Sequence, residues 1–420
     1  MDCHTTPNWY NAPGPGSGQR VGQERLMWLD IEPSSRLKKL PPYLFADLRR
    51  VEAEARGRGV KVIRIAIGDP DNPTPDPVVE ELCRAVRDVT DPNRHRYGCD
   101  VPVEQFAQAA RNFYNRRYGV VLREDQIVTT SGSKDAIAQF AMAVLNPGDV
   151  AIAPSPGYPT YNIGHVFAGA ETYYAPLLAQ NGFLVDFDAI PMDVRRRARL
   201  LWLNYPNNPT TAVADLDFFR AAVEFGRQNN ILICHDNAYG ENTYDGYKAP
   251  SVLQVEGADE VAVEFFSLSK ACNMTGWRVG FVAGNASAVR GLRTVKENTD
   301  NGTLRAVQFA AAKALDCFEQ IVPPINAVYQ RRRDAVIEAL NRSGWELEKP
   351  KATIYVWAPV PEGYGGSSAA FAADLLDKTG VIVTPGLGYG RWGEGFFRIS
   401  LTYPDEVLAE AMGRIVKMKA

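Results

Sequence analysis

The sequence predicts an α/β protein with two domains. The large domain has a mostly parallel sheet of the seven-stranded type, covered by helices on both faces, and the smaller domain is α+β. Short apolar runs alternate with segments of helical spacing between about residues 75 and 300, which is typical of parallel strands joined by crossover helices. A separate set of strands and helices follows residue 341. The 420 residues also exceed what one hydrophobic core normally organises.

The predicted elements of the large domain follow one another along the chain. Short runs that end in turn residues predict strands at 126–130, 149–154, 172–175, 200–204, 231–235, 261–266 and 280–284. Helical spacing predicts helices at 77–89, at 102–118, from the turn at 131–134 through 145, and at 215–229. The turn at 131–134 consists of small residues and a lysine, so its backbone N–H groups could hold a phosphate.

The remaining elements predict a second layer. A double proline at 41–42 opens a helix to about residue 56, and a strand at 61–67 precedes a loop dense in turn residues at 68–75. Further elements are expected as a helical stretch at 306–341, strands at 353–358, 381–384 and 396–401, a helix at 367–378 and a final helix. We therefore expect an N-terminal arm (1–33), a small domain (34–75 with 316–420) and a large, cofactor-binding domain (76–315).

Composition excludes several classes of function. The chain is 45% hydrophobic and 23% charged with a net charge of -3, which offers no basic surface for nucleic acid or an anionic membrane. Apolar runs fall short of the roughly 18 residues of a membrane span, and no export signal begins the chain, so a cytoplasmic location is expected. Cysteines and histidines are scattered, so we expect no metal site. His235 precedes Asp236, but neighbouring strand residues face opposite ways, which favours a packed histidine.

The stretch around Lys270 is where the sequence indicates chemistry. Lys270 follows the apolar run 261–266, so it stands at the carboxyl end of a predicted strand, where open α/β sheets place their ligands. A lysine amine held there can form a Schiff base with an aldehyde, and pyridoxal 5'-phosphate (PLP) is the aldehyde cofactor it suggests. Taken alone, Lys270 is better explained as a surface lysine in a serine-rich loop, and it is the rest of the chain that favours the cofactor role.

Other polar residues supply groups that the phosphate of PLP requires. Ser267 and Ser269 offer hydroxyls, and Arg278 offers a guanidinium fork. Ser133 and Lys134 begin a predicted helix, whose N-terminal amides favour an anion.

The loops after other predicted strands supply groups that the pyridine ring requires. Asp236 could keep the ring nitrogen protonated, so that the ring withdraws electrons from the substrate. Tyr239 and Asn208 could hydrogen-bond the phenolate oxygen, and Tyr158 could stack on the ring.

The chain resembles the fold-type I, PLP-dependent aminotransferases of class I/II from about residue 35 to its end. The resemblance rests on seven motifs in family order and spacing: Gly68-Asp-Pro, Ser131-Gly-Ser-Lys, Pro156-Gly-Tyr-Pro, Asn207-Asn-Pro-Thr, Asp236-Asn-Ala-Tyr, Ser267-Leu-Ser-Lys and Phe397-Arg-Ile-Ser. It implies an aspartate aminotransferase-like fold. It also implies that Lys270 is the Schiff-base lysine and proton-moving base. Arg398 would hold the substrate α-carboxylate, with help from Asn208 and the backbone of Gly68.

Within the group, four segments resemble the LL-diaminopimelate aminotransferases: Leu40-Pro-Pro-Tyr-Leu-Phe-Ala-Asp-Leu, Ala66-Ile-Gly-Asp-Pro-Asp, Asn273-Met-Thr-Gly-Trp-Arg-Val-Gly-Phe and Asp300-Asn-Gly. That family transfers an amino group of LL-diaminopimelate to 2-oxoglutarate. Tyr97 matches a residue that reaches the partner subunit's cofactor phosphate, and Tyr43 one that enters the partner's active site. The resemblance therefore implies a homodimer with shared sites.

Two loops depart from the family pattern. Gly98-Cys-Asp-Val-Pro-Val follows Tyr97, and Leu387-Gly-Tyr-Gly-Arg-Trp392 precedes the strand of Arg398. These loops would line the distal part of the substrate site. Arg305, Arg391 and Lys134 are candidate cations for a distal carboxylate, or surface charges.

The sequence leaves the reaction open between three possibilities. The first is transamination of an L-amino acid with a 2-oxo acid acceptor. The second is elimination, replacement or cyclisation at the β or γ carbon, which uses the same cofactor and lysine. The third is a non-catalytic protein on the same scaffold, which we expect to have lost the lysine or gained a DNA-binding module.

Overall fold

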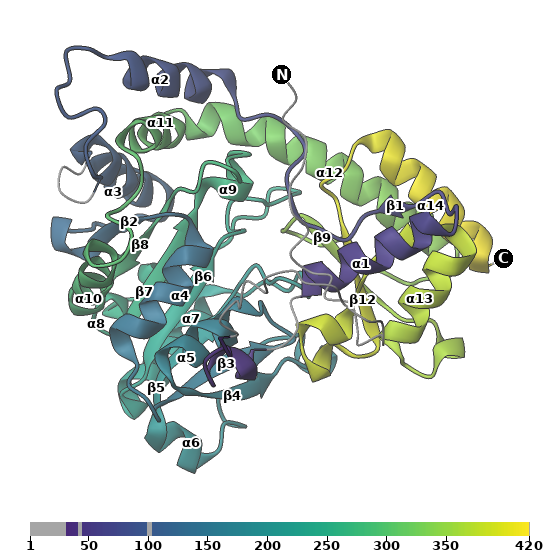
Figure 1. The fold of residues 1–420 in the computed structure, drawn as a ribbon. Helices are drawn as coiled ribbons and strands as arrows, with labels where there is room; N and C mark the ends of the chain where they lie inside the picture. The colour runs from purple at the N-terminus through teal and green to yellow at the C-terminus, as the bar shows by residue number, and fades with distance from the viewer. Residues whose placement is uncertain (1–30, 41–43, 99–102, 420) are drawn as a thin grey trace, which may run out of the picture.

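The computed structural model describes residues 31–40, 44–98 and 103–419. Its main feature is a seven-stranded sheet in the order β2-β8-β7-β6-β5-β3-β4 (Figure 1). The strands are β2 (Ile127–Thr130), β3 (Val150–Ser155), β4 (Glu171–Pro176), β5 (Ala198–Leu203), β6 (Leu232–Asn237), β7 (Ala262–Ser267) and β8 (Gly280–Gly284). Only β8 runs antiparallel to its neighbours. The predicted mostly parallel sheet is confirmed.

Helices cover both faces of this sheet because its strands are apolar on both sides. Along β5, Leu200 and Trp202 pack with the helices of one face, whereas Leu201 and Leu203 pack with those of the other. The first face carries α4 (Ser133–Val144), α5 (Thr160–Ala168) and α10 (Ala286–Glu297). The second carries α3 (Glu104–Tyr118), α7 (Leu216–Asn229) and α11 (Arg305–Asp316), with α2 (Asp76–Arg87) outside them. Shorter helices are α6 (Met192–Arg197), α8 (Ala258–Val261) and α9 (Leu268–Ala271).

A second sheet has the order β11-β12-β9 and is antiparallel. Its strands are β9 (Tyr355–Pro359), β11 (Thr384–Pro385) and β12 (Phe396–Ser400), and a separate parallel pair joins β1 (Ile63–Arg64) to β10 (Val381–Ile382). The helices here are α1 (Leu44–Gly57), α12 (Phe318–Arg342), α13 (Ser368–Thr379) and α14 (Asp405–Lys419). Figure 1 shows α12 running from the large sheet to this second layer.

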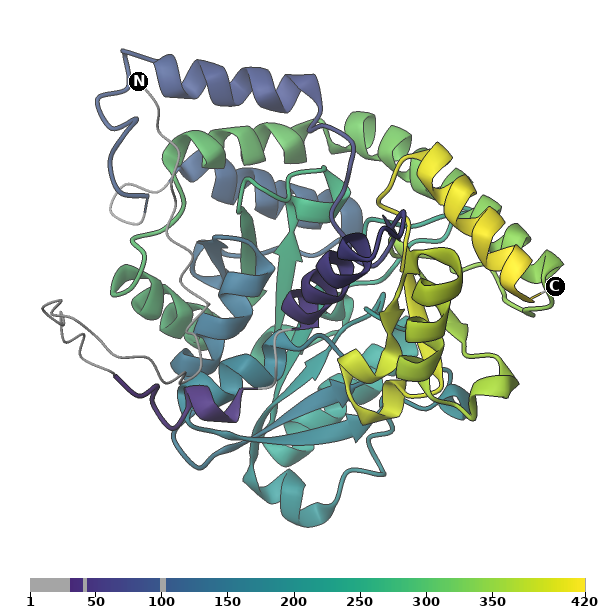
Figure 2. The ribbon, with the colours of Figure 1, turned by 45° about the vertical axis from the view of Figure 1, so that its right-hand side comes forward.

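The segment before residue 75 packs with the C-terminal part of the chain. Leu48 and Ala55 of α1 share a small apolar cluster with Leu376 of α13 and Ile382 of β10. Figure 2 shows α1 lying beside these elements. This contact is in keeping with the expected small domain, whose boundaries stay a prediction, and residues 1–30 of the expected arm lie outside the described residues.

Several elements differ from the prediction. The strand expected at 61–67 is only two residues long, because its partner β10 pairs with it only at Ile63 and Arg64. The helix expected at 306–341 is two helices that meet at Cys317, whose backbone (φ -103°, ψ 22°) leaves the helical region. Helices α5 and α10 were not predicted.

Helix α7 offers a test of how the sequence defines an element boundary. Asp215 precedes the helix, and its carboxylate accepts a hydrogen bond from the Phe218 N–H at 2.8 Å. We expect Asp215→Ala to lower the free energy of unfolding by about 0.5–2 kcal/mol, because this N–H would lose its partner. Thermal unfolding measures the loss. Asp217→Ala, an exposed residue in the same turn, is the control, and an equal loss in both variants would contradict the capping role.

Candidate active site

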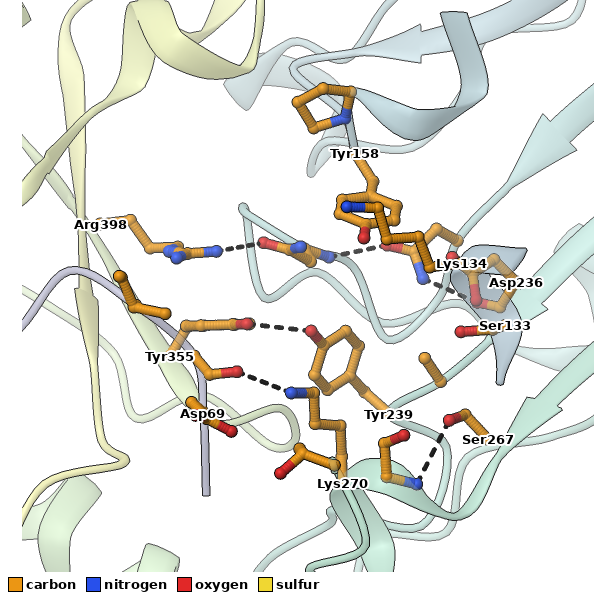
Figure 3. Close-up of a pocket in the computed structure, with 18 of the residues that line it drawn as sticks. Asp69, Ser133, Lys134, Tyr158, Asp236, Tyr239, Ser267, Lys270, Tyr355 and Arg398 are labelled. Atoms are coloured by element: carbon orange, nitrogen blue, oxygen red, sulfur yellow. Dashed lines mark hydrogen bonds between the residues drawn. The ribbon is translucent and has the colours of Figure 1, made fainter. Parts of the chain in front are cut away.

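A cavity of about 450 Å³ lies where the ends of the central strands of the large sheet meet the second sheet. Figure 3 shows its lining, with Lys270 and Asp236 projecting from different elements into one hollow. The structure brings together nearly all the predicted site residues: Gly68, Ser133, Lys134, Tyr158, Asn208, Asp236, Tyr239, Ser267, Ser269, Lys270, Arg278 and Arg398. Tyr97 does not line this cavity and is 66% exposed. Tyr43 lies outside the described residues.

Lys270 stands on α9, the single helical turn that follows β7. Ser267 caps this turn, since its hydroxyl accepts a hydrogen bond from the Ser269 N–H at 3.2 Å. Lys270 Nζ donates to the Gly68 carbonyl at 2.6 Å, which aims the amine across the cavity. Gly68 cannot carry a side chain, because a Cβ there would lie 2.0 Å from the hydroxyl oxygen of Tyr355.

The environment of Lys270 makes its amine a usable base. Burial lowers the pKa of Lys270 to about 8, against the negative charge of Asp69, which raises it. The positive charges of Arg398 and Arg278 lower the pKa further. At neutral pH, therefore, an appreciable fraction of the amine is uncharged.

Asp236 is the penultimate residue of β6, and its side chain is almost fully buried. The Tyr161 hydroxyl donates to Oδ2 at 2.8 Å, whereas buried Oδ1 has no hydrogen-bond partner. Burial raises the pKa of Asp236 to about 6, although Tyr161 and the charge of His235 lower it. A buried carboxylate oxygen without a donor suits a cationic N–H group on a ligand, such as a pyridinium.

The start of α4 and Arg278 form an anion-binding surface at one end of the cavity. Ser133 and Lys134 belong to the first turn of α4, and Gly132 before it has φ 84°. Arg278 donates to the carbonyls of Ser131 at 3.1 Å and Thr275 at 2.9 Å. A Cβ at Gly132 would lie 2.8 Å from a guanidinium nitrogen of Arg278, so glycine allows this approach. A helix N-terminus beside a guanidinium suits a phosphate.

Arg398 lies at the other end of the cavity, on β12. Its guanidinium is buried and donates to Asn208 Oδ1 at 2.6 Å and to the Ala66 carbonyl at 2.7 Å. The rings of Tyr355 and Tyr389 lie 3.9 and 4.9 Å from its central carbon. No described carboxylate pairs with this buried charge. An anionic ligand would balance it, and a carboxylate fits the planar fork.

Several residues of the site were not predicted from the sequence. Tyr161 stands three residues after Tyr158 of the Pro156-Gly-Tyr-Pro motif, about one helical turn, a spacing that could have indicated it. Tyr355 and Tyr389 come from the second sheet and the turn beyond it, and Tyr355 exchanges a hydrogen bond with Tyr239 at 2.9 Å. Their positions depend on how the two sheets pack. Asn204, which donates to the Asp236 carbonyl at 2.7 Å, ends a predicted strand without a motif of its own.

The candidate distal cations have different surroundings. Lys134 lines the cavity. Arg305 is buried and pairs with Asp91 at 3.1 Å, so it is neither at the cavity nor a surface charge. Arg391 stacks on Trp392 at 3.6 Å, and both line a neighbouring cavity of about 510 Å³ that shares Tyr158 and Tyr389 with the first.

The described part of the chain has neither a cluster of metal ligands nor a membrane-spanning helix. No group of three histidine, cysteine or acidic side chains there could hold a metal ion. No described helix combines the length and apolar character needed to cross a bilayer.

The fold and the geometry of the site define a class of protein, and comparison with known proteins identifies its family. The chain belongs to the class I and II aminotransferases, whose family model matches residues 60–415. It is therefore a PLP-dependent transferase. The buried Oδ1 of Asp236, which has no hydrogen-bond partner in the protein, suits the ring nitrogen of that cofactor, and the anion-binding surface at α4 suits its phosphate.

Particular relatives are similar over nearly the whole chain. The LL-diaminopimelate aminotransferase of Moorella thermoacetica is 51% identical over 386 residues, 92% of this chain and 98% of that protein. Substrate-bound BacF of Bacillus subtilis has a TM-score of 0.87 at 35% identity, over 93% of this chain and 98% of that one. A single mutant of Thermus thermophilus aspartate aminotransferase has a TM-score of 0.85 at 25% identity, over 92% and 100%. The family resemblance and the expected aspartate aminotransferase-like fold are confirmed.

Asp236 allows a test of the cost of the buried charge. Because its pKa is raised, the Asp236 carboxyl binds a proton more tightly in the folded protein than in the unfolded chain, and this proton stabilises the fold. The stabilisation is complete below the ordinary pKa of 3.8 and is lost as pH rises through about 6. We therefore expect cofactor-free Asp236→Asn to be more stable than the unmodified chain above this range, by about 2–3 kcal/mol, with no gain near about pH 4. Calorimetry across pH measures this difference. Exposed Asp217→Asn should show no such trend, and a gain that is independent of pH would disprove the electrostatic explanation.

Proposed function

We propose that this protein transfers an amino group of LL-diaminopimelate to 2-oxoglutarate. The observation that carries the proposal is that Lys270, Asp236 and Arg398 all open into one cavity. The relatives support the substrate, since proteins named LL-diaminopimelate aminotransferase are up to 51% identical over 92% of the chain. Their names also favour transamination over elimination, replacement or cyclisation.

Separate groups of residues would hold PLP at its reactive carbon and its phosphate. Lys270, on the helical turn after β7, would hold the cofactor covalently through its amine, at the aldehyde carbon of PLP. The first turn of α4 with Ser133 and Lys134, and the guanidinium of Arg278, would bind the phosphate. Ser267 and Ser269 stand at the same end of the cavity and could add hydroxyl donors.

The ring would be held by another group of residues. Asp236 would pair with the ring nitrogen, Tyr158 would stack on the ring, and Tyr239 and Asn208 would donate to its oxygen. When bound, PLP supplies a protonated pyridine ring that withdraws electrons from the bond between the substrate Cα and its hydrogen.

The chain's own residues would orient the substrate and move its proton. Arg398 would bind the α-carboxylate bidentately and so align the Cα–H bond beside the amine of Lys270. Lys270 Nζ would take up the Cα proton and return it later, a role that suits a pKa near 8. Burial of Arg398 excludes water from the clamp and strengthens it.

Charged side chains that line the cavity support a substrate with two charged ends. Arg49, Lys134 and Asp69 all line it. A basic side chain could meet the distal carboxylate of LL-diaminopimelate, and Asp69 could meet its distal ammonium group. Neutral amino acids would leave these groups without a ligand.

We also propose a homodimer with shared active sites in the cytoplasm. The exposure of Tyr97 away from its own cavity supports this arrangement, because the side chain is free to reach a partner's phosphate. Tyr43 would enter the partner's site from the same interface. We further propose that the chain divides into an arm (1–33), a small domain (34–75 with 316–420) and a large domain (76–315).

The proposed reaction can be assayed directly. The protein loaded with PLP should form glutamate from LL-diaminopimelate and 2-oxoglutarate, as measured by mass spectrometry. Lys270→Ala should abolish turnover and release all its cofactor on denaturation after borohydride treatment, because no amine would attach it. Turnover in the absence of any 2-oxo acid would instead indicate an elimination or cyclisation enzyme.

The carboxylate clamp predicts a specific kinetic defect. Arg398→Ala should reduce kcat/KM for the amino donor by the equivalent of about 2–5 kcal/mol, because a buried charged partner of the carboxylate is lost. Steady-state kinetics at several donor concentrations measures it. The control is Arg50→Ala, which removes an exposed arginine paired with Glu54. Similar kcat/KM values in both variants would refute the clamp.

A further inference from the structure

His235 lies directly behind Asp236 on β6, on the opposite face of the sheet. It is fully buried, and its ring packs 4.7 Å from that of Phe219 on α7, whereas Asp236 meets Tyr161 of α5 on the other face. The two side chains therefore belong to different layers of the fold. The two residues are consecutive in the chain, so a charge on His235 acts on the carboxyl group of Asp236.

The hydrogen bonds of His235 require a proton on at least one ring nitrogen. Nε2 lies 2.9 Å from the Tyr205 backbone carbonyl, which can only accept, so Nε2 carries a proton. Nδ1 lies 2.7 Å from Glu264 Oε2. If Glu264 is ionised, Nδ1 must carry a proton as well, and the ring is an imidazolium.

Glu264 is surrounded by donors that favour its ionised form. Besides His235, four groups donate to its two oxygens: the Tyr114 hydroxyl (2.6 Å), Asn237 Nδ2 (3.1 Å), the Ser251 hydroxyl (2.8 Å) and the Val252 N–H (3.1 Å). Burial raises the pKa of Glu264, but the hydrogen bonds of His235, Tyr114 and Asn237 and the charge of His235 lower it below the ordinary value. Independently of His235, the four donors to its two oxygens favour a carboxylate over a protonated carboxyl group. Glu264 is therefore a carboxylate.

Nearby acidic groups do not provide a competing partner for His235. Tyr114 keeps its proton, since burial and the charge of Glu264 raise its pKa well above the ordinary value. Glu241 belongs to the same buried region, but it pairs with Arg117 at 2.9 Å and accepts from the Tyr118 hydroxyl at 2.7 Å. On the other face of β6, the titratable neighbours of Asp236 are Tyr161 and the residues lining the cavity.

A second buried histidine has the opposite pattern. The indole N–H of Trp202 donates to Nε2 of His165 at 2.9 Å, so this nitrogen has no proton and the ring is neutral. Burial lowers the pKa of His165 to about 3. The chain thus contains a matched neutral histidine of equal burial, on the other face of the same sheet.

We propose that His235, held as an imidazolium by Glu264, is a positioning residue that keeps Asp236 in its carboxylate form. The ion pair would offset the cost of burying a carboxylate that has only one hydrogen-bond donor, and so keep it ready for the ring nitrogen of PLP. The charge of His235 is among the influences that lower the pKa of Asp236 against burial. This inference rests on the proposed function, since Asp236 acts there through PLP.

Nitrogen NMR tests the charge of His235 independently of activity. The PLP-loaded protein is labelled with ¹⁵N only in histidine, of which the chain has four. We expect both ring nitrogens of His235 to be protonated at neutral pH, as its two hydrogen bonds require, and only one in His165. His4→Gln, His95→Gln and His165→Gln assign His235 by elimination, so no variant of His235 need fold. An unprotonated nitrogen in His235 at neutral pH would overturn the inference.

The pH dependence of the holoenzyme tests the effect on Asp236. Removing a nearby positive charge makes a carboxyl group protonate at higher pH. His235→Gln removes the imidazolium itself, and Glu264→Gln removes the carboxylate that holds the second proton of the imidazole. In both variants the acid limb of kcat/KM and the pH titration of the cofactor's absorbance should therefore move to higher pH, by roughly one unit. His165→Gln should move neither. A uniform loss of activity with an unmoved acid limb would reduce His235 to a packing role. Absence of transamination in the unmodified enzyme would refute the proposed function, while the NMR result would still decide the charge.

Discussion

The constraint on which the site depends is that two buried charged groups have hydrogen-bonding capacity that the protein itself does not complete. Asp236 has a buried oxygen with no donor, and Arg398 has a buried guanidinium whose hydrogen-bond partners are neutral. Such groups are unfavourable unless a ligand completes them. A cofactor with a cationic ring and a substrate with a carboxylate do so, and the surrounding fold must hold both charges in place until they arrive.

The fold holds them by closing one layer against another. Lys270 reaches from the large sheet to Gly68, Asn208 receives the guanidinium of Arg398 from the second sheet, and Tyr239 meets Tyr355. Each of these bonds joins residues that are far apart in sequence. The site is therefore an interface between two packed layers, and a change in their relative position would alter the substrate clamp and the lysine together.

Much of the cofactor site was predictable because most of its groups stand at or just beyond the end of an apolar strand. Lys270, Asp236 and Arg278 carried recognisable local patterns, and the structure places them around one cavity. Arg305 was misjudged, since its ion pair with Asp91 joins segments more than 200 residues apart. The break at Cys317 was also missed, because helical spacing continues through it while the backbone does not.

The sequence by itself determined where most strands lie along the chain, the small-residue turns between them and the polar groups at their ends. These features follow from local patterning and turn chemistry. The tertiary structure alone decided which groups meet and in what state of charge. The imidazolium form of His235 depends on a backbone carbonyl at Tyr205 and a carboxylate at Glu264, 30 and 29 residues away. Hydrogen-bond partners of this kind are set by the packing of strands and helices, which local sequence does not contain.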